Sequence, residues 1–159
     1  MTPTARWADL EAAEPEIAAT GRRIIYQHGP GLAYLATSRP AGGLRIHPFC
    51  PVVTGGGIYG LINDSPKRRD LAANGSYAIH AFPVADRDDE FMLAGTARRV
   101  DDPAEIAAVK KAYDEAGASS SPDEWTFEFL IDRALLSLYN PRDSGLPLWP
   151  PKYLRWRPR

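Results

Sequence analysis

Residues 44–71 read LRIHPFCPVVTGGGIYGLINDSPKRRDL. The apolar alternation, the glycine run and the Ser-Pro-Lys sequence predict two strands and a short helix, over residues 44–54, 57–63 and 66–73. Pro48 and Pro51 have no backbone N–H group to donate, so the first strand is expected to lie at a sheet edge or to be bulged there. The segment therefore predicts a hairpin followed directly by a helix.

The start of this helix has an unusual charge pattern. Ser65 is a favourable cap and Pro66 suits the first helical position, but the first turn then carries Lys67, Arg68 and Arg69. Cations at a helix N-terminus oppose the helix dipole. A bound anion would relieve that conflict, since free backbone N–H groups, the Ser65 hydroxyl and the Lys67 ammonium could all hold it. The pattern predicts a phosphate-bearing ligand along the hairpin.

A structural role is the alternative for the same cations. Because side chains alternate along a strand, Arg45 shares a face with His47 and could reach the anion. Arg45 could equally belong to a surface ion pair. The run Lys67–Arg69 could be a solvated face paired with Asp64 and Asp70. The residues alone leave both interpretations open.

Composition limits the class of protein. The chain has 159 residues, of which 44% are hydrophobic and 25% charged, so we expect a single globular domain over residues 1–159. The net charge of -1 favours neither nucleic acid nor an anionic membrane as partner. We find no membrane-length apolar run and no signal-peptide pattern at the N-terminus. The single Cys50 fits the cytoplasm, and the three histidines have no metal-ligand spacing, so we expect no metal site.

The remaining elements follow from periodicity and caps. Residues 5–28 are expected to form two helices, the second beginning at Pro15, and a capping sequence at Asp102 begins a helix that ends near Gly117. A change of apolar phase after Asp132-Arg133 predicts a bulge in a long strand. Further strands are expected at residues 32–38, 76–82, 91–100, 125–139 and 152–156. This order predicts an α+β fold with mainly antiparallel strands.

The order of several short sequences resembles the pyridoxamine 5'-phosphate oxidase-like family. The matching segments are WADLEAAEPEI, LAYLATS, GGLRIHP, SPKRRDL and DEFMLAGTARRVDDP, over residues 7–17, 32–38, 42–48, 65–71 and 89–103. The resemblance implies a six- to seven-stranded split β-barrel with flanking helices. It also implies a homodimer with FMN at the interface, acting as a flavin-dependent oxidoreductase on a small-molecule substrate.

The resemblance also implies which residues touch the cofactor. Arg45 and Lys67 occupy the positions that contact the cofactor phosphate, with Ser65 beside them. Residues at the isoalloxazine positions are Ile46, His47 and Pro48 on the first strand and Gly60 and Leu61 on the facing strand. Glu90 occupies the approximate position of a polar residue that touches the ring.

The sequence departs from the true oxidase at specific positions. Cys50 stands where that enzyme has a lysine, and the tail lacks its Arg-Leu-x-Pro ending. The likeness therefore does not extend to oxidation of pyridoxamine phosphate, and no catalytic residue is identified. The tail residues Trp149, Arg155, Trp156 and Arg157 either close the cofactor cleft of a partner subunit or hold a C-terminal strand.

Two alternatives to an FMN enzyme remain open. One is a reductase that uses F420, whose longer acidic tail would favour an additional basic groove containing Arg68 and Arg69. The other is a flavin or haem carrier without turnover. Haem would need an axial ligand, for which the candidates are His47 and His80.

Overall fold

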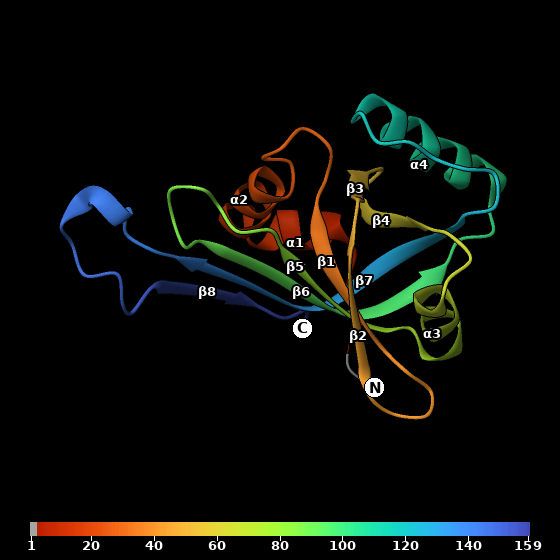
Figure 1. Cartoon of the computed structure of the whole chain (residues 1–159), viewed down its shortest axis with the longest axis horizontal. Coiled ribbons are helices and arrows are strands. Elements are labelled where there is room, and N and C mark those ends of the chain that lie inside the picture. The colour runs from red at the N-terminus through yellow and green to blue at the C-terminus, as the bar shows by residue number, and fades with distance from the viewer. Residues whose placement is uncertain (1–2) are drawn as a thin grey trace.

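The computed structural model describes residues 3–159, in which four α-helices flank one curled sheet (Figure 1). The helices are α1 (Trp7–Ala13), α2 (Pro15–Ile25), α3 (Pro66–Asn74) and α4 (Pro103–Glu115), and a 3-10 turn, η1, covers Arg142–Ser144. The strands are β1 (Ala33–Ser38), β2 (Leu44–Phe49), β3 (Pro51–Thr54), β4 (Gly57–Ile62), β5 (Ser76–Ala81), β6 (Glu90–Arg99), β7 (Trp125–Leu138) and β8 (Lys152–Trp156).

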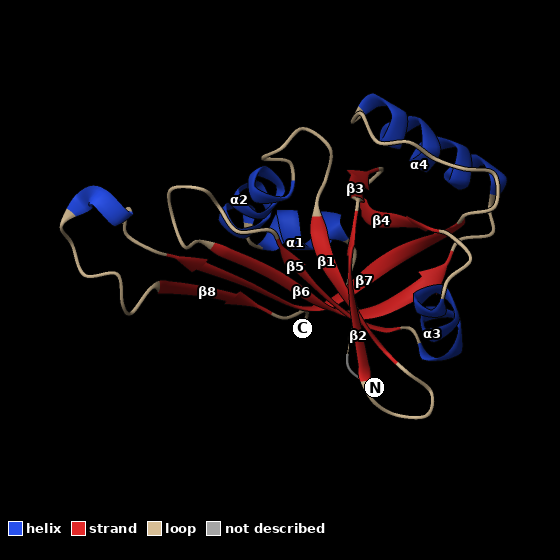
Figure 2. Cartoon of the chain, in the orientation of Figure 1, coloured by secondary structure: helices blue, strands red, loops and turns tan. Residues whose placement is uncertain are grey.

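The strands follow the order β2-β1-β5-β6-β7-β4-β3, with β8 added beside β7, and every adjacent pair is antiparallel. Strands β2 and β3 are consecutive in the chain but lie at opposite ends of this order. The sheet therefore curls until its two ends meet, with helices on its flanks (Figure 2). This architecture confirms the predicted α+β split barrel.

One expected strand, residues 44–54, is divided in two. The ladder breaks at Cys50, so that β2 pairs with β1 while β3 pairs with β4. Pro48 and Pro51 flank the break, and both strands lie at ends of the strand order, where a missing N–H donor is tolerated. The sheet consequently has eight strands where six or seven were expected.

The helix ends follow the signals in the sequence. Pro15 begins α2, and the Asp102 carboxylate caps α4 by accepting a hydrogen bond from the Glu105 N–H at 2.9 Å. Gly75 ends α3 in the left-handed conformation, with φ of 70°. Within residues 3–159, no helix has the length and hydropathy that a membrane crossing requires.

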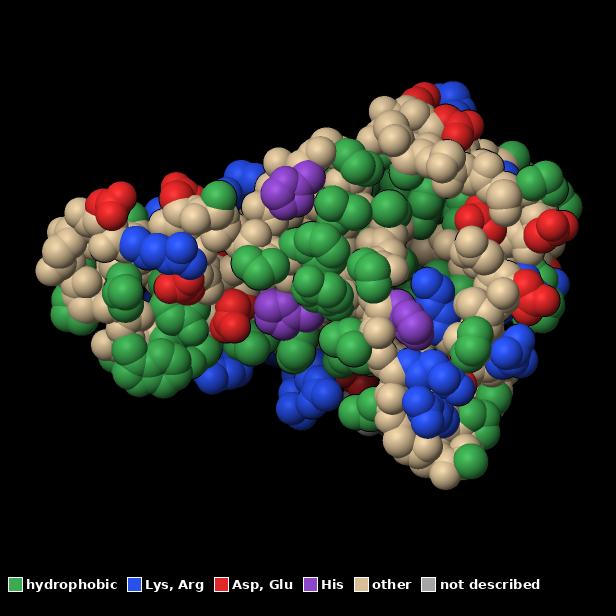
Figure 3. All heavy atoms as spheres, viewed as in Figure 1, with side chains coloured by type: hydrophobic (Ala, Val, Ile, Leu, Met, Phe, Trp, Pro, Cys, Tyr) green, Lys and Arg blue, Asp and Glu red, His purple; other side chains and the backbone are tan. Residues whose placement is uncertain are grey.

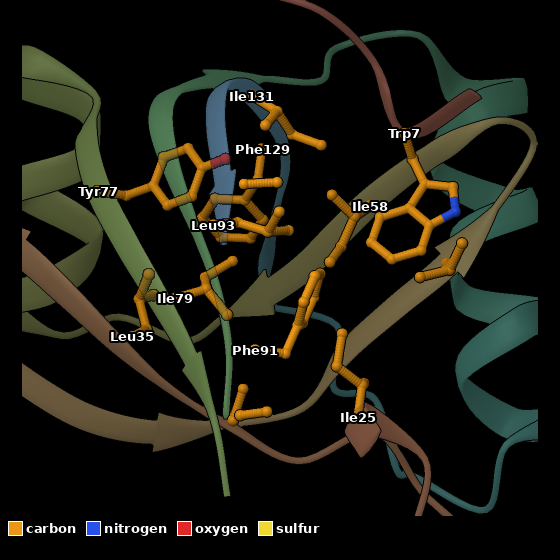
Figure 4. Close-up of a cluster of buried hydrophobic side chains, with 14 of the residues drawn as sticks. Trp7, Ile25, Leu35, Ile58, Tyr77, Ile79, Phe91, Leu93, Phe129 and Ile131 are labelled. Atoms are coloured by element: carbon orange, nitrogen blue, oxygen red, sulfur yellow. The ribbon is translucent and has the colours of Figure 1, made fainter. Parts of the chain in front are cut away.

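The main core lies between the inner face of the sheet and the helices α1 and α2 (Figure 4). Trp7 packs edge-on against Phe91, with ring centroids 6.1 Å apart, and both side chains are buried. A methyl group added at Gly21 of α2 would lie 2.4 Å from the Phe91 ring, so glycine allows this helix to approach the sheet. Each such large apolar side chain contributes roughly 1.5–3 kcal/mol on burial.

A second, smaller cluster holds α4 against β3 and β4. Its buried members are Val52, Tyr59, Leu61, Val100, Val109 and Tyr113. The Tyr113 hydroxyl accepts a hydrogen bond from the Leu61 N–H at 3.0 Å and donates one to the Cys50 carbonyl oxygen. Helix α4 is thus tied directly to the point where β2 gives way to β3.

The predicted bulge in β7 is confirmed. Ala94 lies opposite Arg133 but Gly95 lies opposite Ile131, so Asp132 is the extra residue. A Cβ atom at Gly95 would lie 2.0 Å from the Leu130 carbonyl oxygen, which explains why glycine stands opposite the bulge.

Candidate functional site

Strand β2 is tied to helix α3 through a buried carboxylate. The Arg45 Nε lies 2.8 Å from Asp70 Oδ2, and the Thr37 hydroxyl donates to the same oxygen at 2.9 Å. Asp70 is only 3% exposed. The predicted phosphate ligand Arg45 is therefore held in place by an ion pair with Asp70, which is the structural alternative raised by the sequence. Its remaining guanidinium N–H groups stay available for an anion.

Lys67 lies at the same corner, one turn of α3 before Asp70. Burial lowers the pKa of the Lys67 ammonium, and the charge of Cys50 raises it. Burial likewise raises the pKa of the Cys50 thiol, and the charge of Lys67 lowers it. Lys67 forms no hydrogen bond or ion pair with any other part of residues 3–159, although it is half-buried.

The Ser65 hydroxyl is also without a partner. Its backbone is extended, with φ of -154° and ψ of 162°, as expected for a residue that precedes a helix. The side chain makes no capping hydrogen bond, and its Oγ atom is buried with no partner among the described residues. A buried hydroxyl usually has a hydrogen-bond partner. Ser65 and Lys67 thus present two unused donors at the start of α3, which is what an anionic group requires.

His47 lies on the same strand as Arg45. Arg45 precedes it by two residues and Cys50 follows it by three, and the side chain shares a face with Arg45. It lies opposite buried Leu35 in the register and is itself half-buried. We call the set Arg45, His47, Cys50, Ser65 and Lys67 the α3 corner.

Other predicted cofactor contacts lie elsewhere. Ile46 and Pro48 point to the opposite face of β2, where Ile46 is 66% exposed. Gly60 and Leu61 are buried in β4, and the Leu61 N–H already donates to Tyr113. A Cβ atom at Gly60 would lie 3.0 Å from the Phe129 ring. Contact of these four residues with a cofactor stays a prediction.

The two arginines after Lys67 have partners within the chain. Arg68 pairs with Asp64 at 2.7 Å, donates to the Asp123 carbonyl oxygen and stacks over Trp125 at 4.5 Å. Arg69 is exposed and pairs loosely with Asp64 at 3.5 Å. The solvated-face alternative therefore describes Arg69, which is 67% exposed, whereas the Arg68 side chain is only 12% exposed and is held by contacts within the chain.

The outer face of the sheet carries exposed apolar side chains. Leu44 and Ile46 are 75% and 66% exposed, and Tyr34 stacks on Phe82 with ring centroids 4.5 Å apart. Figure 3 shows apolar side chains gathered in the middle of one face of the molecule, where β1, β2 and β5 lie in Figure 1, with lysine and arginine side chains beside them. This apolar surface has no covering element within residues 3–159.

His80 belongs to this outer face. It lies opposite Tyr34 on one side and Met92 on the other. Its Nδ1 is 2.8 Å from the Ala81 carbonyl oxygen, and its Nε2 is 3.9 Å from Glu90. His80 and His47 therefore occupy opposite faces of the sheet, so the structure does not bring the two candidate haem ligands together.

A charged network at the far end of β7 was not anticipated. Glu128 is fully buried and accepts hydrogen bonds from Arg6 at 2.7 Å and Arg98 at 2.6 Å. Arg6 also donates to the Tyr59 hydroxyl, which in turn donates to Glu105. Burial, then the Glu105 hydrogen bond, raises the pKa of Tyr59 to about 12. One signal was available, since Glu128 is the single charge within residues 125–131, the first half of β7.

Comparison with known proteins identifies the fold but no family. No family model matches the sequence, and no curated protein matches it. Among solved structures, a heme-binding protein from Mycobacterium smegmatis superposes with a TM-score of 0.62 at 17% identity, over 87% of this chain and 57% of that one. HutZ, the heme storage protein from Vibrio cholerae, gives 0.56 at 18% identity, over 74% of this chain and 89% of that one.

A third solved structure, ChuZ from Campylobacter jejuni, gives a TM-score of 0.61 at 11% identity, over 79% of this chain and 55% of that one. This chain thus spans little more than half of the Mycobacterium and Campylobacter proteins. At these identities the likeness is one of fold. The chain has the curled, split-barrel sheet of these proteins.

Proposed function

We propose that this chain binds a planar cofactor with an acidic group, and that haem is the first candidate. The observation that carries the proposal is the pair of unused donors at the α3 corner, the Lys67 ammonium and the buried Ser65 hydroxyl. A carboxylate of haem or a phosphate of FMN would satisfy both. Haem is placed first because the proteins of similar fold from Mycobacterium smegmatis and Vibrio cholerae are heme-binding and heme-storage proteins.

The residues of the corner fit haem as follows. Lys67 and Ser65 would hold an acidic side chain of the macrocycle, and the free N–H groups of Arg45 would add to that charge. His47 shares a face with Arg45 and is the axial ligand that belongs to this corner. Bound haem would supply iron chemistry, whereas the chain would bind and orient it. We assign no side chain at the corner an acid or base role, and we therefore propose a cofactor-binding protein.

FMN is the second candidate, favoured by the form of the α3 N-terminus. A serine hydroxyl and a lysine ammonium at the start of a helix together suit a phosphate, although the Arg68 and Arg69 N–H groups already donate to the Ser65 carbonyl oxygen. The sequence resemblance to the pyridoxamine 5'-phosphate oxidase-like family supports the same cofactor, which would supply hydride chemistry to an oxidoreductase. An F420 reductase finds less support, because Arg68 is already engaged with Asp64 and Trp125.

The proposal includes a homodimer. Leu44, Ile46 and Tyr34 expose apolar surface on neighbouring strands, and a second copy of the chain could cover it. A cavity of about 740 Å³ lies away from the α3 corner, between α2, β3 and α4. A partner subunit would close the corner over a planar cofactor. Sedimentation of the wild type and an Ile46→Asp variant tests this, with dimer expected only for the wild type.

The experiment that tests the proposal is reconstitution with haem, FMN and F420 in separate titrations. Absorption spectroscopy follows haem, and quenching of fluorescence follows FMN and F420. Saturable haem binding that loses its histidine-ligated spectrum in His47→Ala, but not in His28→Ala, would support the haem assignment. Binding of FMN together with turnover of a reduced nicotinamide would contradict the haem assignment and support the flavin-dependent oxidoreductase. If none of the three cofactors binds, the proposed function is wrong and the likeness to these proteins is one of fold alone.

A further inference from the structure

Three arginines gather on the outer face of the sheet where β7 meets β8. Arg155 of β8 lies opposite Leu135 of β7, and Arg133 lies two residues before Leu135 on the same face. Arg157 follows Arg155 by two residues and continues that face. From the sequence, we expected Arg155 and Arg157 either to close the cofactor cleft of a partner subunit or to hold a C-terminal strand. Arg133 was not part of either prediction.

These arginines surround a small cavity with an apolar floor. The cavity measures about 160 Å³ and is lined by Met92, Arg133, Ala134, Leu135, Arg155, Trp156 and Arg157. Met92 lies opposite Leu135 in the register, so the two apolar side chains adjoin on neighbouring strands. The cavity therefore has an apolar base and a cationic rim.

The rim charge is uncompensated within the chain. None of Arg133, Arg155 and Arg157 has a carboxylate oxygen within 4.0 Å anywhere in residues 3–159. Arg155 is steadied by the Tyr153 ring, 4.7 Å below its guanidinium carbon. Most other arginines of the chain are paired with carboxylates, as in the Glu128 network.

Acidic residues lie near two of the three arginines but do not line this cavity. Glu90, on the β6 strand with Met92, faces His80 at 3.9 Å. Asp9 and Glu14 line a different cavity, of about 630 Å³, which shares Arg155 and Arg157 but not Arg133 or Met92. Of the three arginines, Arg133 lines only the smaller cavity, from which both carboxylates are absent.

We propose that the cavity bounded by Arg133, Arg155 and Met92 binds a small molecule that joins an apolar body to a phosphate or carboxylate group. Guanidinium groups bind both anions through paired N–H donors. The apolar body lies on Met92 and Leu135, in the direction of His80. The site is separate from the α3 corner, because Arg45 and His47 point to the inner face of β2.

Methionine methyl groups provide a direct readout. The chain has two methionines, so protein labelled with carbon-13 at the methionine methyl groups gives a simple NMR spectrum, and Met92→Leu assigns the Met92 signal. Phenyl phosphate and benzoate are the two probes. Phenol lacks the anion, and inorganic phosphate lacks the apolar body.

The expected result is a saturable shift of the Met92 signal with phenyl phosphate or benzoate, much weaker with phenol and with inorganic phosphate. Arg133→Gln and Arg155→Gln should each weaken binding about tenfold, as loss of one charge-assisted contact does. Arg39→Gln removes a charge from the turn before β2 and should leave binding unchanged. So should Lys67→Met, which separates this site from the proposed cofactor corner. A shift that phenol reproduces, or that all four variants weaken equally, would overturn the proposal.

Discussion

The Arg45 guanidinium lies 2.8 Å from the carboxylate of Asp70, which the fold buries to 3% exposure. This ion pair joins the edge strand β2 to helix α3, and strands β3 and β4 lie between the two in the sequence. At the start of the same helix, the Ser65 hydroxyl is buried without a hydrogen-bond partner among the described residues. The ion pair thus ties β2 to α3 through groups of the chain itself.

The Arg45–Asp70 pair should contribute to stability. Arg45→Ala leaves a buried carboxylate with only the Thr37 hydroxyl, and we expect the free energy of unfolding to fall by about 1–3 kcal/mol, less than for a fully buried pair because Arg45 is partly exposed. Urea unfolding followed by circular dichroism measures it. The matched control is Arg69→Ala, whose exposed pair with Asp64 should be worth less than about 0.5 kcal/mol. Equal losses in both variants would contradict the role of Asp70.

The Glu128 network predicts an asymmetry between its partners. Replacing Arg6 and Arg98 together by Met leaves a fully buried carboxylate unpaired, which should cost about 3 kcal/mol or more. Glu128→Gln should cost less, about 1–2 kcal/mol, because both arginines are over 40% exposed and can turn to water. Chemical denaturation of the three proteins checks this order. A larger loss of stability in Glu128→Gln than in the double arginine variant would contradict this account, because it would show that leaving the arginines unpaired costs more than leaving the carboxylate unpaired.

Two glycines of the sheet should respond differently to alanine. At Gly60 the new methyl group meets the edges of the Phe49 and Phe129 rings at 3.0–3.1 Å, and we expect a loss of about 1–3 kcal/mol. At Gly95 it would lie 2.0 Å from a backbone carbonyl oxygen, which cannot move without loss of the bulge. Gly95→Ala should therefore destabilise the protein more than Gly60→Ala. Thermal unfolding distinguishes the two, and a milder effect at Gly95 would argue against the bulge.

Buried tyrosines predict a loss of stability at alkaline pH. Burial raises the pKa of Tyr77 and Tyr113, and burial together with Glu105 raises that of Tyr59 to about 12. In the unfolded chain these hydroxyls ionise near pH 10. Their contribution is thus fully present below pH 10 and is lost as the pH rises through the folded values. Urea midpoints measured from about pH 9 to 12 should fall, and the fall should be smaller in Tyr59→Phe.

The fold could be predicted because its signals are local. Pro15, Asp102 and Gly75 mark helix ends through their own backbone chemistry, and the phase change at Asp132 marks the bulge within a few residues. The division of strand 44–54 at Cys50 depends on the sheet curling until its ends meet, which no local pattern contains.

The site was less predictable because it depends on distant contacts. The sequence placed Arg45, Ser65 and Lys67 together but could not decide which carboxylate faces Arg45, since that depends on the packing of β2 against α3. Asp70 looked like a partner for the neighbouring cations and instead pairs across to β2. The pairing of Glu128 likewise brings together Arg6, just before α1, and Arg98 of β6, which are far from it in the sequence.

The central claim is that Lys67 holds the acidic group of a planar cofactor, and equilibrium titration of Lys67→Met tests it most directly. Lys67 has no partner within the described chain, so the variant should fold normally. We predict that Lys67→Met weakens binding of haem or FMN about tenfold, leaves riboflavin unaffected because it has no phosphate, and that Arg69→Met changes none of them. Equal weakening of FMN and riboflavin, or an equal effect of Arg69→Met, would contradict the account.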